Sequence, residues 1–185
     1  MSDPKFCQAC ATPLEWIEMA EDGGAKARLR CVACGHTHWN NPTPVLAAII
    51  EYRGQVLLAR NAAWPHKMYA LITGFMEAGE SPQEGIAREI KEETNLDASA
   101  LNLVGVYDFQ RMNQVIIAYH AVADGEVSLS PELVDYKLYD LPALRCWPAG
   151  TGYALADWLR TRGHEPVFFT ASENEERRRG LEPRS

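Results

Sequence analysis

Short runs of apolar residues, alternating with polar positions and separated by turn residues, occupy the middle of the chain. Their lengths are typical of strands. The predicted strands cover residues 45–51, 55–60, 69–73, 103–109, 115–122 and 134–139. Two segments have helical spacing: 82–94, and 154–162 with Leu155, Trp158 and Leu159 on one side and Gly163 at its end. Strands interrupted by a few helices predict an α/β fold in which a mixed sheet packs between helices.

The predicted helix at 82–94 has a well-defined start. Ser81 is a natural N-cap, Pro82 suits the first helical position, and Glu84 completes a capping box. The chain enters this helix from a loop that begins near Gly74. The helix is therefore predicted with a fixed position relative to that loop.

Three glutamates share one face of this helix. Glu89, Glu92 and Glu93 stand at positions i, i+3 and i+4, so their side chains project in the same direction. Like charges so placed destabilise a bare helix, whereas Mg²⁺ or Mn²⁺ would neutralise them through oxygen ligands. Such an ion is normally completed by water and substrate phosphates, which indicates phosphate chemistry. The alternative is a solvated acidic face.

Residues 74–96 as a whole resemble the Nudix box, G-x5-E-x7-R-E-U-x-E-E-x-G-U, where U is a bulky apolar residue. The final glycine of the motif is replaced by Asn95, which best tolerates the same left-handed backbone. The resemblance implies the Nudix α/β/α sandwich and metal-dependent hydrolysis of a diphosphate bond. The matching residues are Gly74, Glu80, Arg88, Glu89, Ile90, Glu92, Glu93 and Leu96.

The resemblance also assigns roles to individual residues. Glu89, Glu92 and Glu93 are the expected metal ligands, and the resemblance implies that the main-chain carbonyl of Thr73 also binds the metal. Arg88 is expected to hold a box carboxylate, with an exposed ion pair as the alternative. Glu132, ahead of the last predicted strand, is expected to be a ligand or the catalytic base, with a solvated loop glutamate as the alternative. Which glutamate accepts the proton of water stays open. The expected catalytic residues are Glu80, Arg88, Glu89, Glu92, Glu93 and Glu132.

A second motif lies at the N-terminus, where two CxxC knuckles flank a turn signal at 22–24. Two knuckles at this spacing predict a tetrahedral zinc site with a structural role. Two disulfides are the alternative, but no apolar signal segment marks the chain as secreted. The predicted zinc ligands are Cys7, Cys10, Cys31 and Cys34.

Together the two motifs resemble the zinc-ribbon Nudix hydrolases, over roughly residues 5–163. That group includes NADH pyrophosphatases and related FAD and ADP-ribose pyrophosphatases. The resemblance implies cleavage of dinucleotide cofactors to AMP plus a mononucleotide, with ADP-ribose or NAD-capped RNA as alternative substrates. A catalytically silent nucleotide sensor is the alternative of a different class. The S-Q-P-W-P-F-P motif of NADH pyrophosphatases is missing at residues 106–112, so a broad preference among dinucleotides is expected.

Aromatic and basic residues beyond the box are candidates for substrate binding. Phe109 is placed to stack on a base and Arg111 to meet a phosphate. Each is otherwise a core or surface residue. The remaining candidates are Phe75, Tyr153 and Trp64.

Length and charge complete the prediction. The 185 residues are expected to divide into a zinc ribbon at 1–40, a Nudix domain at 41–170 and a charged, disordered tail at 171–185. A net charge of −7 disfavours extended nucleic-acid binding. Apolar runs are too short to span a membrane, and a cytoplasmic location is expected. Family resemblance suggests a homodimer.

Overall fold

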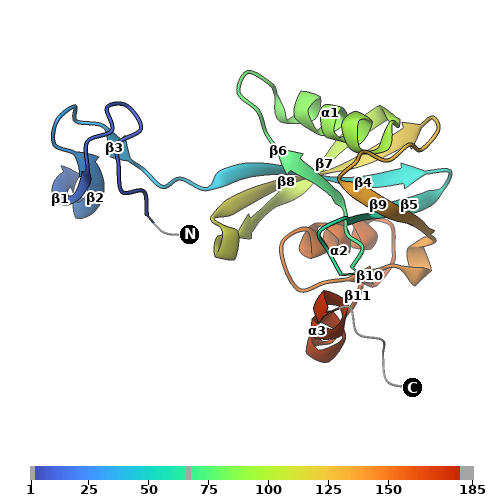
Figure 1. Cartoon of the computed structure of the whole chain (residues 1–185). Coiled ribbons are helices and arrows are strands. Elements are labelled where there is room, and N and C mark those ends of the chain that lie inside the picture. Colours follow the sequence, from blue (N-terminus) through green and yellow to red (C-terminus); the bar gives the residue numbers. More distant parts are fainter. Residues whose placement is uncertain (1–2, 66–67, 180–185) are drawn as a thin grey trace. The chain divides into compact units, whose positions relative to one another are not determined.

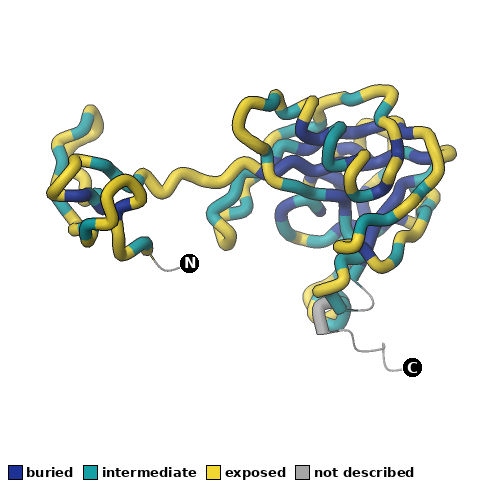
Figure 2. Tube along the Cα trace, turned by 45° about the horizontal axis from the view of Figure 1, so that its top comes forward, coloured by how far each residue is buried: buried dark blue, intermediate teal, exposed yellow. Residues whose placement is uncertain are grey.

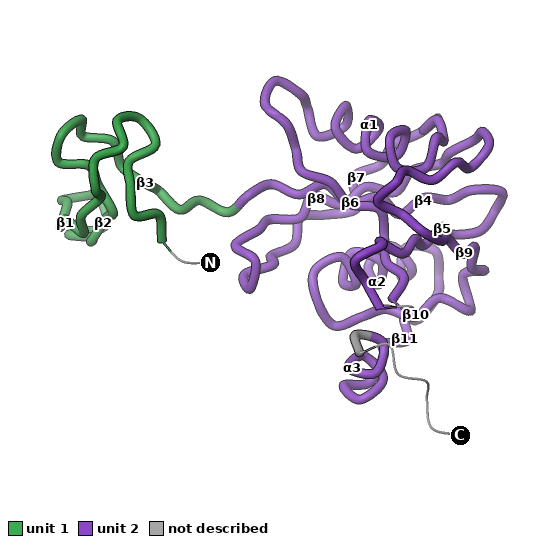
Figure 3. Tube along the Cα trace, viewed as in Figure 1, with its two compact units in different colours: residues 1–42 green, residues 43–185 purple. Residues whose placement is uncertain are grey.

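The computed structural model describes residues 3–65 and 68–179, which form two compact units. The boundary between the units lies between Pro42 and Thr43 (Figure 3), two residues beyond the division expected at 40/41. Each unit has its own sheet.

The N-terminal unit is a small antiparallel sheet of three strands in the order β1-β2-β3. The turn between β1 and β2 falls at the Asp22-Gly23 signal, and Gly24 adopts a φ of +103°. A positive φ of this size is accessible to glycine, which explains the residue at that position. The strands are β1 (Leu14–Glu21), β2 (Gly24–Cys31) and β3 (Thr37–His38).

The larger unit is built on a sheet with the order β7-β8-β4-β5-β9, and β6 also pairs with β4. Strands β4 and β8 run parallel and the other pairs run antiparallel, so the sheet is mixed, as predicted. Its strands are β4 (Thr43–Tyr52), β5 (Gln55–Asn61), β6 (Ile72–Phe75), β7 (Asp97–Phe109), β8 (Gln114–Asp124) and β9 (Leu133–Tyr139). A small parallel pair, β10 (Arg145–Cys146) and β11 (Val167–Phe168), stands apart from it.

Helices α1 (Pro82–Thr94) and α2 (Thr151–Thr161) cover opposite faces of the large sheet (Figure 1), which is the predicted α/β/α arrangement. The alternation along β4 shows why: Leu46 packs in the core beneath α1, whereas Val45 packs in a core that contains Ala154 of α2. Both faces are covered, so the middle of β4 is continuously buried (Figure 2). Two short 3₁₀ turns, η1 (Gln110–Met112) and η2 (Leu141–Ala143), complete the connections.

Three predicted elements differ from the structure by three residues or more at one end. The strand expected at 103–109 is β7, which begins at Asp97 because its pairing with β8 continues to Asp124. The strand expected at 69–73 is β6, which begins at Ile72 and includes Gly74, because pairing with β4 continues through that glycine. Ala70 makes only an isolated bridge to Ala59. The second helix starts at Thr151 and therefore gains a turn over the prediction.

The prediction of a disordered tail is wrong for residues 171–179, which form helix α3 (Ala171–Arg179). Thr170 and Glu173 make a reciprocal cap: Glu173 N–H donates to Thr170 Oγ1 at 3.3 Å, and Thr170 N–H donates to Glu173 Oε2 at 2.7 Å. Arg145 also binds Glu173 through two bonds of 2.8 and 2.9 Å. Charge-rich composition suggested disorder, but a cap and a bidentate ion pair stabilise the helix. Residues 180–185 lie outside the described part of the chain.

Among the described residues, no helix has the length and apolar character needed to cross a membrane.

Candidate active site

Helix α1 presents the acidic face, and its limits match the prediction. The capping box at Ser81 and Glu84 is formed, and Asn95 ends the helix with a φ of +63°. Gly85 allows the helix to lie close to the sheet, since a Cβ there would stand 2.5 Å from Leu46 Cδ1. The helix is therefore held at both ends and pressed against β4.

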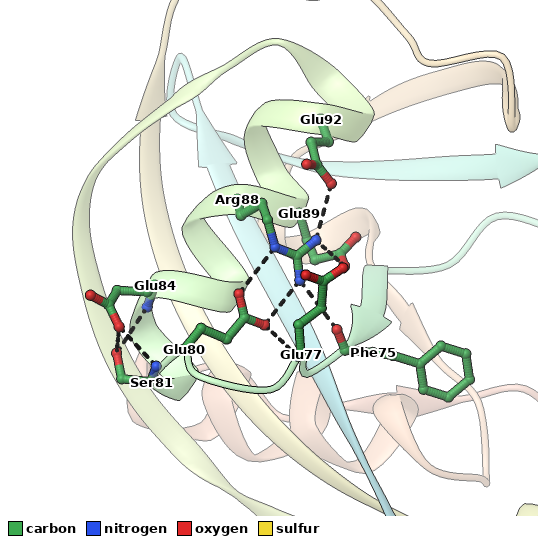
Figure 4. Close-up of polar contacts among 8 residues, drawn as sticks. All are labelled: Phe75, Glu77, Glu80, Ser81, Glu84, Arg88, Glu89 and Glu92. Atoms are coloured by element: carbon green, nitrogen blue, oxygen red, sulfur yellow. Dashed lines mark hydrogen bonds and ion pairs between the residues drawn. The ribbon is translucent and has the colours of Figure 1, made fainter.

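Arg88 is the hub of the polar contacts around this face (Figure 4). Its Nε and Nη2 donate to the two carboxylate oxygens of Glu80 at 3.1 and 3.0 Å. Its Nη1 donates to Glu89 at 2.8 Å and to Glu92 at 3.0 Å. Nη2 also reaches the carbonyl oxygen of Phe75 at 3.2 Å. One guanidinium thus joins the helix, the preceding loop and the end of β6.

Gly74 lies directly against the Glu89 carboxyl group. A Cβ at Gly74 would stand 1.8 Å from Glu89 Cδ, so any larger residue would displace this glutamate. The backbone of β6 therefore approaches the acidic face as closely as a glycine permits.

Glu132 reaches the same place from a different element. The loop before β9 is bonded to the end of α1, where Ser128 N–H donates to Thr94 O and Ser130 N–H to Glu93 O, both at 3.0 Å. On its other side, Glu132 O accepts from Ala62 N–H at 2.8 Å. These backbone bonds use helix carbonyls that would otherwise lack partners, and they place Glu132 beside the helix.

These side chains line a cleft of about 730 Å³. Its carboxylates repel one another in a partly desolvated space. Burial first, and then the charges of Glu89, Glu132 and Glu92, together raise the pKa of Glu93 to about 7. Burial likewise raises the pKa of Glu89. The lining comprises Val45, Thr73, Gly74, Phe75, Glu77, Arg88, Glu89, Glu92, Glu93, Gln114, Ser130, Pro131 and Glu132.

The donor set of the cleft fits a hard divalent cation. Its carboxylates carry more negative charge than Arg88 neutralises, and oxygen is the ligand atom that Mg²⁺ and Mn²⁺ prefer. Ser130 Oγ is buried in the cleft and has no hydrogen-bond partner among the described residues, so it is a further oxygen available to a ligand. The residues that would hold the ion are Thr73, Glu89, Glu92, Glu93 and Glu132.

A second cavity of about 490 Å³ adjoins this cleft, with Val45, Thr73 and Gln114 common to both. Its walls are mainly apolar and aromatic, as is usual for pockets that bind small molecules. Three predicted candidates line it: Trp64, Phe109 and Arg111. The guanidinium of Arg111 lies over the Phe109 ring at 5.3 Å.

The remaining predicted residues lie elsewhere. Phe75 lines the carboxylate cleft with its ring largely exposed. Glu80 is not in the cleft lining, and both its oxygens are bound by Arg88. Tyr153 lines neither cavity; it projects from the first turn of α2 and its ring faces Phe168 at 6.1 Å.

Several lining residues were missed from the sequence. Gln114, Ser130 and Trp147 carry no local signal, since their positions follow from strand pairing and loop packing. Asn174 and Arg177 lie on α3, which the Thr170-x-x-Glu173 capping pattern could have predicted.

In the N-terminal unit the four predicted cysteines converge. Their Sγ atoms all lie within 4.8 Å of one another, and three pairs are 3.5 to 3.6 Å apart. A tetrahedral Cys₄ zinc site, with Zn–S distances of about 2.3 Å, requires S–S separations of about 3.8 Å. All five cysteines of the chain are free, so the disulfide alternative is not realised. The cluster suggests zinc.

Family comparisons agree with both motifs. The model described as NUDIX domain matches residues 41–160, and the zinc-ribbon model described as Nudix N-terminal matches residues 5–40. The two matches together cover residues 5–160, so each unit of the structure contains one of them.

The chain is also similar to curated proteins named NAD-capped RNA hydrolase NudC. It is 26% identical to that of Stutzerimonas stutzeri (strain A1501) over 90% of this chain and 60% of the relative. It is 28% identical to that of Pseudomonas aeruginosa (strain LESB58) over 78% of this chain and 51% of the relative. The chain therefore spans little more than half the length of these relatives.

Among solved structures, a NUDIX hydrolase from Nitrosomonas europaea is similar over nearly the whole of both chains. It is 27% identical with a TM-score of 0.72, covering 90% of this chain and 97% of that one. An ADP-ribose pyrophosphatase from Streptococcus suis shares the fold, with a TM-score of 0.55 at 21% identity over 70% of this chain and all of that one.

Proposed function

Because the chain belongs to the Nudix family, we propose that it is a metal-dependent pyrophosphohydrolase that cleaves the diphosphate bond of nucleoside diphosphate derivatives. The favoured substrates are the dinucleotide cofactors NADH, NAD⁺ and FAD, which would yield AMP and a second mononucleotide. The observation that carries the proposal is the cleft in which glutamates from α1 and Glu132 meet.

The chain's own residues explain why the cleft suits a diphosphate. When bound, the divalent ion would offset phosphate charge and lower the pKa of a water ligand. Glu89, Glu92 and Glu93 supply its carboxylate ligands from one helix face. Arg88 orients two of them through the 2.8 and 3.0 Å bonds to Glu89 and Glu92. Glu132 and the box glutamates are the candidates for the base that accepts the proton of the attacking water.

The adjoining cavity supports a substrate that extends beyond the diphosphate. Its volume of about 490 Å³ and its aromatic residues Trp64, Phe109 and Trp147 suit a nucleoside, whose base has flat faces for stacking. The relatives named NAD-capped RNA hydrolase also support a nicotinamide dinucleotide as the reacting group.

Other properties belong to the same proposal. The catalytic ion is Mg²⁺ or Mn²⁺, and zinc occupies the N-terminal Cys₄ cluster in a structural role. We further propose that the protein acts as a homodimer in the cytoplasm, on the basis of the family resemblance.

The test is product analysis with a panel of NADH, NAD⁺, FAD and ADP-ribose in Mg²⁺ or Mn²⁺. Chromatography should show AMP with nicotinamide mononucleotide, flavin mononucleotide or ribose phosphate, and no free phosphate. Pyrophosphate release from simple nucleoside triphosphates, with dinucleotides untouched, would overturn the substrate assignment.

Hydrolysis of NAD-capped RNA is the second candidate, because the curated relatives carry that name and the bond cleaved is the same. The net charge of −7 opposes tight binding of the RNA body. A capped oligonucleotide turned over with a much higher kcat/KM than free NAD⁺ would favour this candidate over the cofactor reaction.

A further inference from the structure

The cavity beside the carboxylate cleft has charged residues of one sign only. The charged side chains that line it are those of Arg111 and Arg177. No aspartate or glutamate is among the described residues that line it. This is unexpected by composition, because the chain has 25 acidic and 18 basic residues. Acidic groups gather in the cleft, and the neighbouring cavity is left positive.

Arg177 in particular has no carboxylate partner within the described part of the chain. Its Nη2 donates to the carbonyl oxygen of Tyr69 at 2.8 Å, and its guanidinium lies 4.1 Å from the Phe169 ring and 5.6 Å from the Trp147 ring. Burial, with Arg145 adding to the effect, lowers the pKa of Arg177. A partly desolvated cation with spare donors is unfavourable until an anion approaches it.

Arg145 provides the contrast on the other side of the same aromatic ring. It lies 4.4 Å from the Phe169 ring, but its charge is neutralised by the bidentate bond to Glu173, and it does not line the cavity beside the cleft. The two arginines therefore make similar ring contacts, yet only Arg177 adds positive charge to the cavity wall.

The position of the cavity next to the carboxylate cleft indicates which part of a substrate would reach Arg177. Val45, Thr73 and Gln114 line both, so a substrate whose diphosphate lies in the cleft continues directly into the cavity. There the rings of Trp64, Phe109 and Trp147 offer faces for a base. Stacking uses the apolar walls and leaves the arginines available for an anionic group, which the planar guanidinium binds through two parallel bonds.

We propose that Arg177, together with Arg111, binds a phosphate esterified to the substrate's ribose, beyond the diphosphate that is cleaved. The inference rests on the proposed function and adds that, among its substrates, derivatives with a third phosphate are preferred over those without one. Arg177 is then a specificity-determining residue contributed by α3, outside the segment that matches the NUDIX domain model.

Three sources offer this chemistry: the 2′-phosphate of NADPH, the 3′-phosphate of coenzyme A and the 3′-phosphodiester of NAD-capped RNA. Each can be compared with a compound that lacks this phosphate. NADPH is paired with NADH, coenzyme A with dephospho-coenzyme A, and NAD-capped RNA with NAD⁺. The measured quantity is the ratio of kcat/KM within each pair. This ratio does not depend on how much of a variant is folded, because both members are assayed with the same preparation.

The enzyme should prefer the more phosphorylated member of at least one pair, and Arg177→Gln should reduce that preference about tenfold or more, the scale of a lost charge-assisted bond. Arg177→Lys keeps the positive charge but cannot make two parallel bonds to a phosphate, so it should retain part of the preference. The matched control is Arg160→Gln, which removes an exposed arginine that lines neither cavity and whose ion pair lies within α2 rather than with α3, and it should leave the ratio unchanged. The pair that responds identifies the source of the phosphate.

Equal losses for both members of every pair in Arg177→Gln, or no loss, would overturn the inference. A binding measurement, which needs no hydrolysis, tests the inference separately from the proposed function. Metal-free protein should bind adenosine 2′,5′-bisphosphate or adenosine 3′,5′-bisphosphate more tightly than AMP in calorimetry, and Arg177→Gln should abolish the difference. That result supports the inference even if no dinucleotide is hydrolysed, in which case the proposed function alone fails. Equal binding of all three nucleotides overturns the inference.

Discussion

The backbone N–H of Ser130 donates to the carbonyl oxygen of Glu93 at 3.0 Å, and so ties the loop before β9 to the last turn of α1. Glu93 therefore has two roles. Its carbonyl oxygen holds the loop, and its carboxyl group lines the cleft. Glu132 follows two residues after Ser130, which makes its distance from the helix a consequence of backbone bonding rather than of side-chain attraction. Two carboxylates from separate elements can then repel each other without moving apart.

The first prediction concerns the helix carboxylates. Glu92→Gln and Glu93→Gln should each lower kcat/KM more than about 10²-fold, because each removes a ligand charge while keeping the side-chain shape. Steady-state hydrolysis in Mg²⁺ and Mn²⁺ checks this, with circular dichroism to establish folding. Glu126→Gln is the control, since Glu126 lines neither cavity. Near-normal rates in both variants would show that these carboxylates are only a solvated face.

The second prediction links metal affinity to pH through Glu93, whose pKa is raised by burial to about 7. At pH 6 the metal-free protein holds this proton, so binding Mn²⁺ should release about one proton and be weaker than at pH 8. Calorimetry at pH 6 in buffers of different ionisation enthalpy counts the protons. Glu93→Gln should remove the release, and unchanged proton release in that variant would contradict the assignment.

The same pKa fixes the sign of a stability effect in the metal-free protein. An unfolded glutamate titrates near pH 4.3, so between about pH 4.3 and pH 7 the folded state binds more protons than the unfolded state. Stability from this group is fully present below that window and is lost as pH rises through it. Thermal unfolding of Glu93→Gln should lack this part of the pH dependence.

The third prediction concerns the contact between Gly74 and Glu89. Gly74→Ala should leave the fold intact, because Gly74 has no positive φ, but should displace the Glu89 carboxyl, which lies 1.8 Å from the added Cβ. Mn²⁺ affinity should fall by about 10-fold or more, the scale of a disturbed ligand environment. Gly23→Ala is the control, where the new Cβ meets nothing closer than 3.7 Å. Wild-type affinity in Gly74→Ala would mean that Glu89 is not a ligand.

The fourth prediction concerns the N-terminal unit. Protein washed with a weak chelator should retain about one zinc per chain by elemental analysis, as a single Cys₄ site requires. Cys31→Ser should lose that zinc and the protection of the 14–31 hairpin from proteolysis, because a unit of this size depends on its metal for stability. A zinc-free wild-type protein with an intact hairpin would contradict the prediction.

The sequence predicted the parts of the fold and site that depend on local spacing. Helix α1 has the predicted limits because its caps are encoded at both ends, by Ser81 and by Asn95. The three glutamates share a face because of helical periodicity alone. The four cysteines likewise converge as their spacing indicated.

The parts that sequence could not predict depend on contacts between distant segments. Gln114 lines both hollows because the start of β8 lies where β4 begins, a register that no local pattern encodes. Helix α3 was missed because its composition is charged, whereas its stability depends on Arg145, which lies 28 residues earlier. Tyr153 lines neither cavity, because it lies in the first turn of α2 with its ring against Phe168, and this packing could not be read from the sequence.

The position of α3 has a practical consequence for work on related domains. The NUDIX domain model ends at residue 160, and a protein cut there would retain the box helix, the sheet and all five cleft glutamates. It would lack Asn174 and Arg177, and with them one wall of the neighbouring cavity. Substrate profiles measured on such a minimal domain would report the catalytic cleft alone. Selectivity inferred from the box and its immediate surroundings therefore describes a different binding site from that of the whole chain.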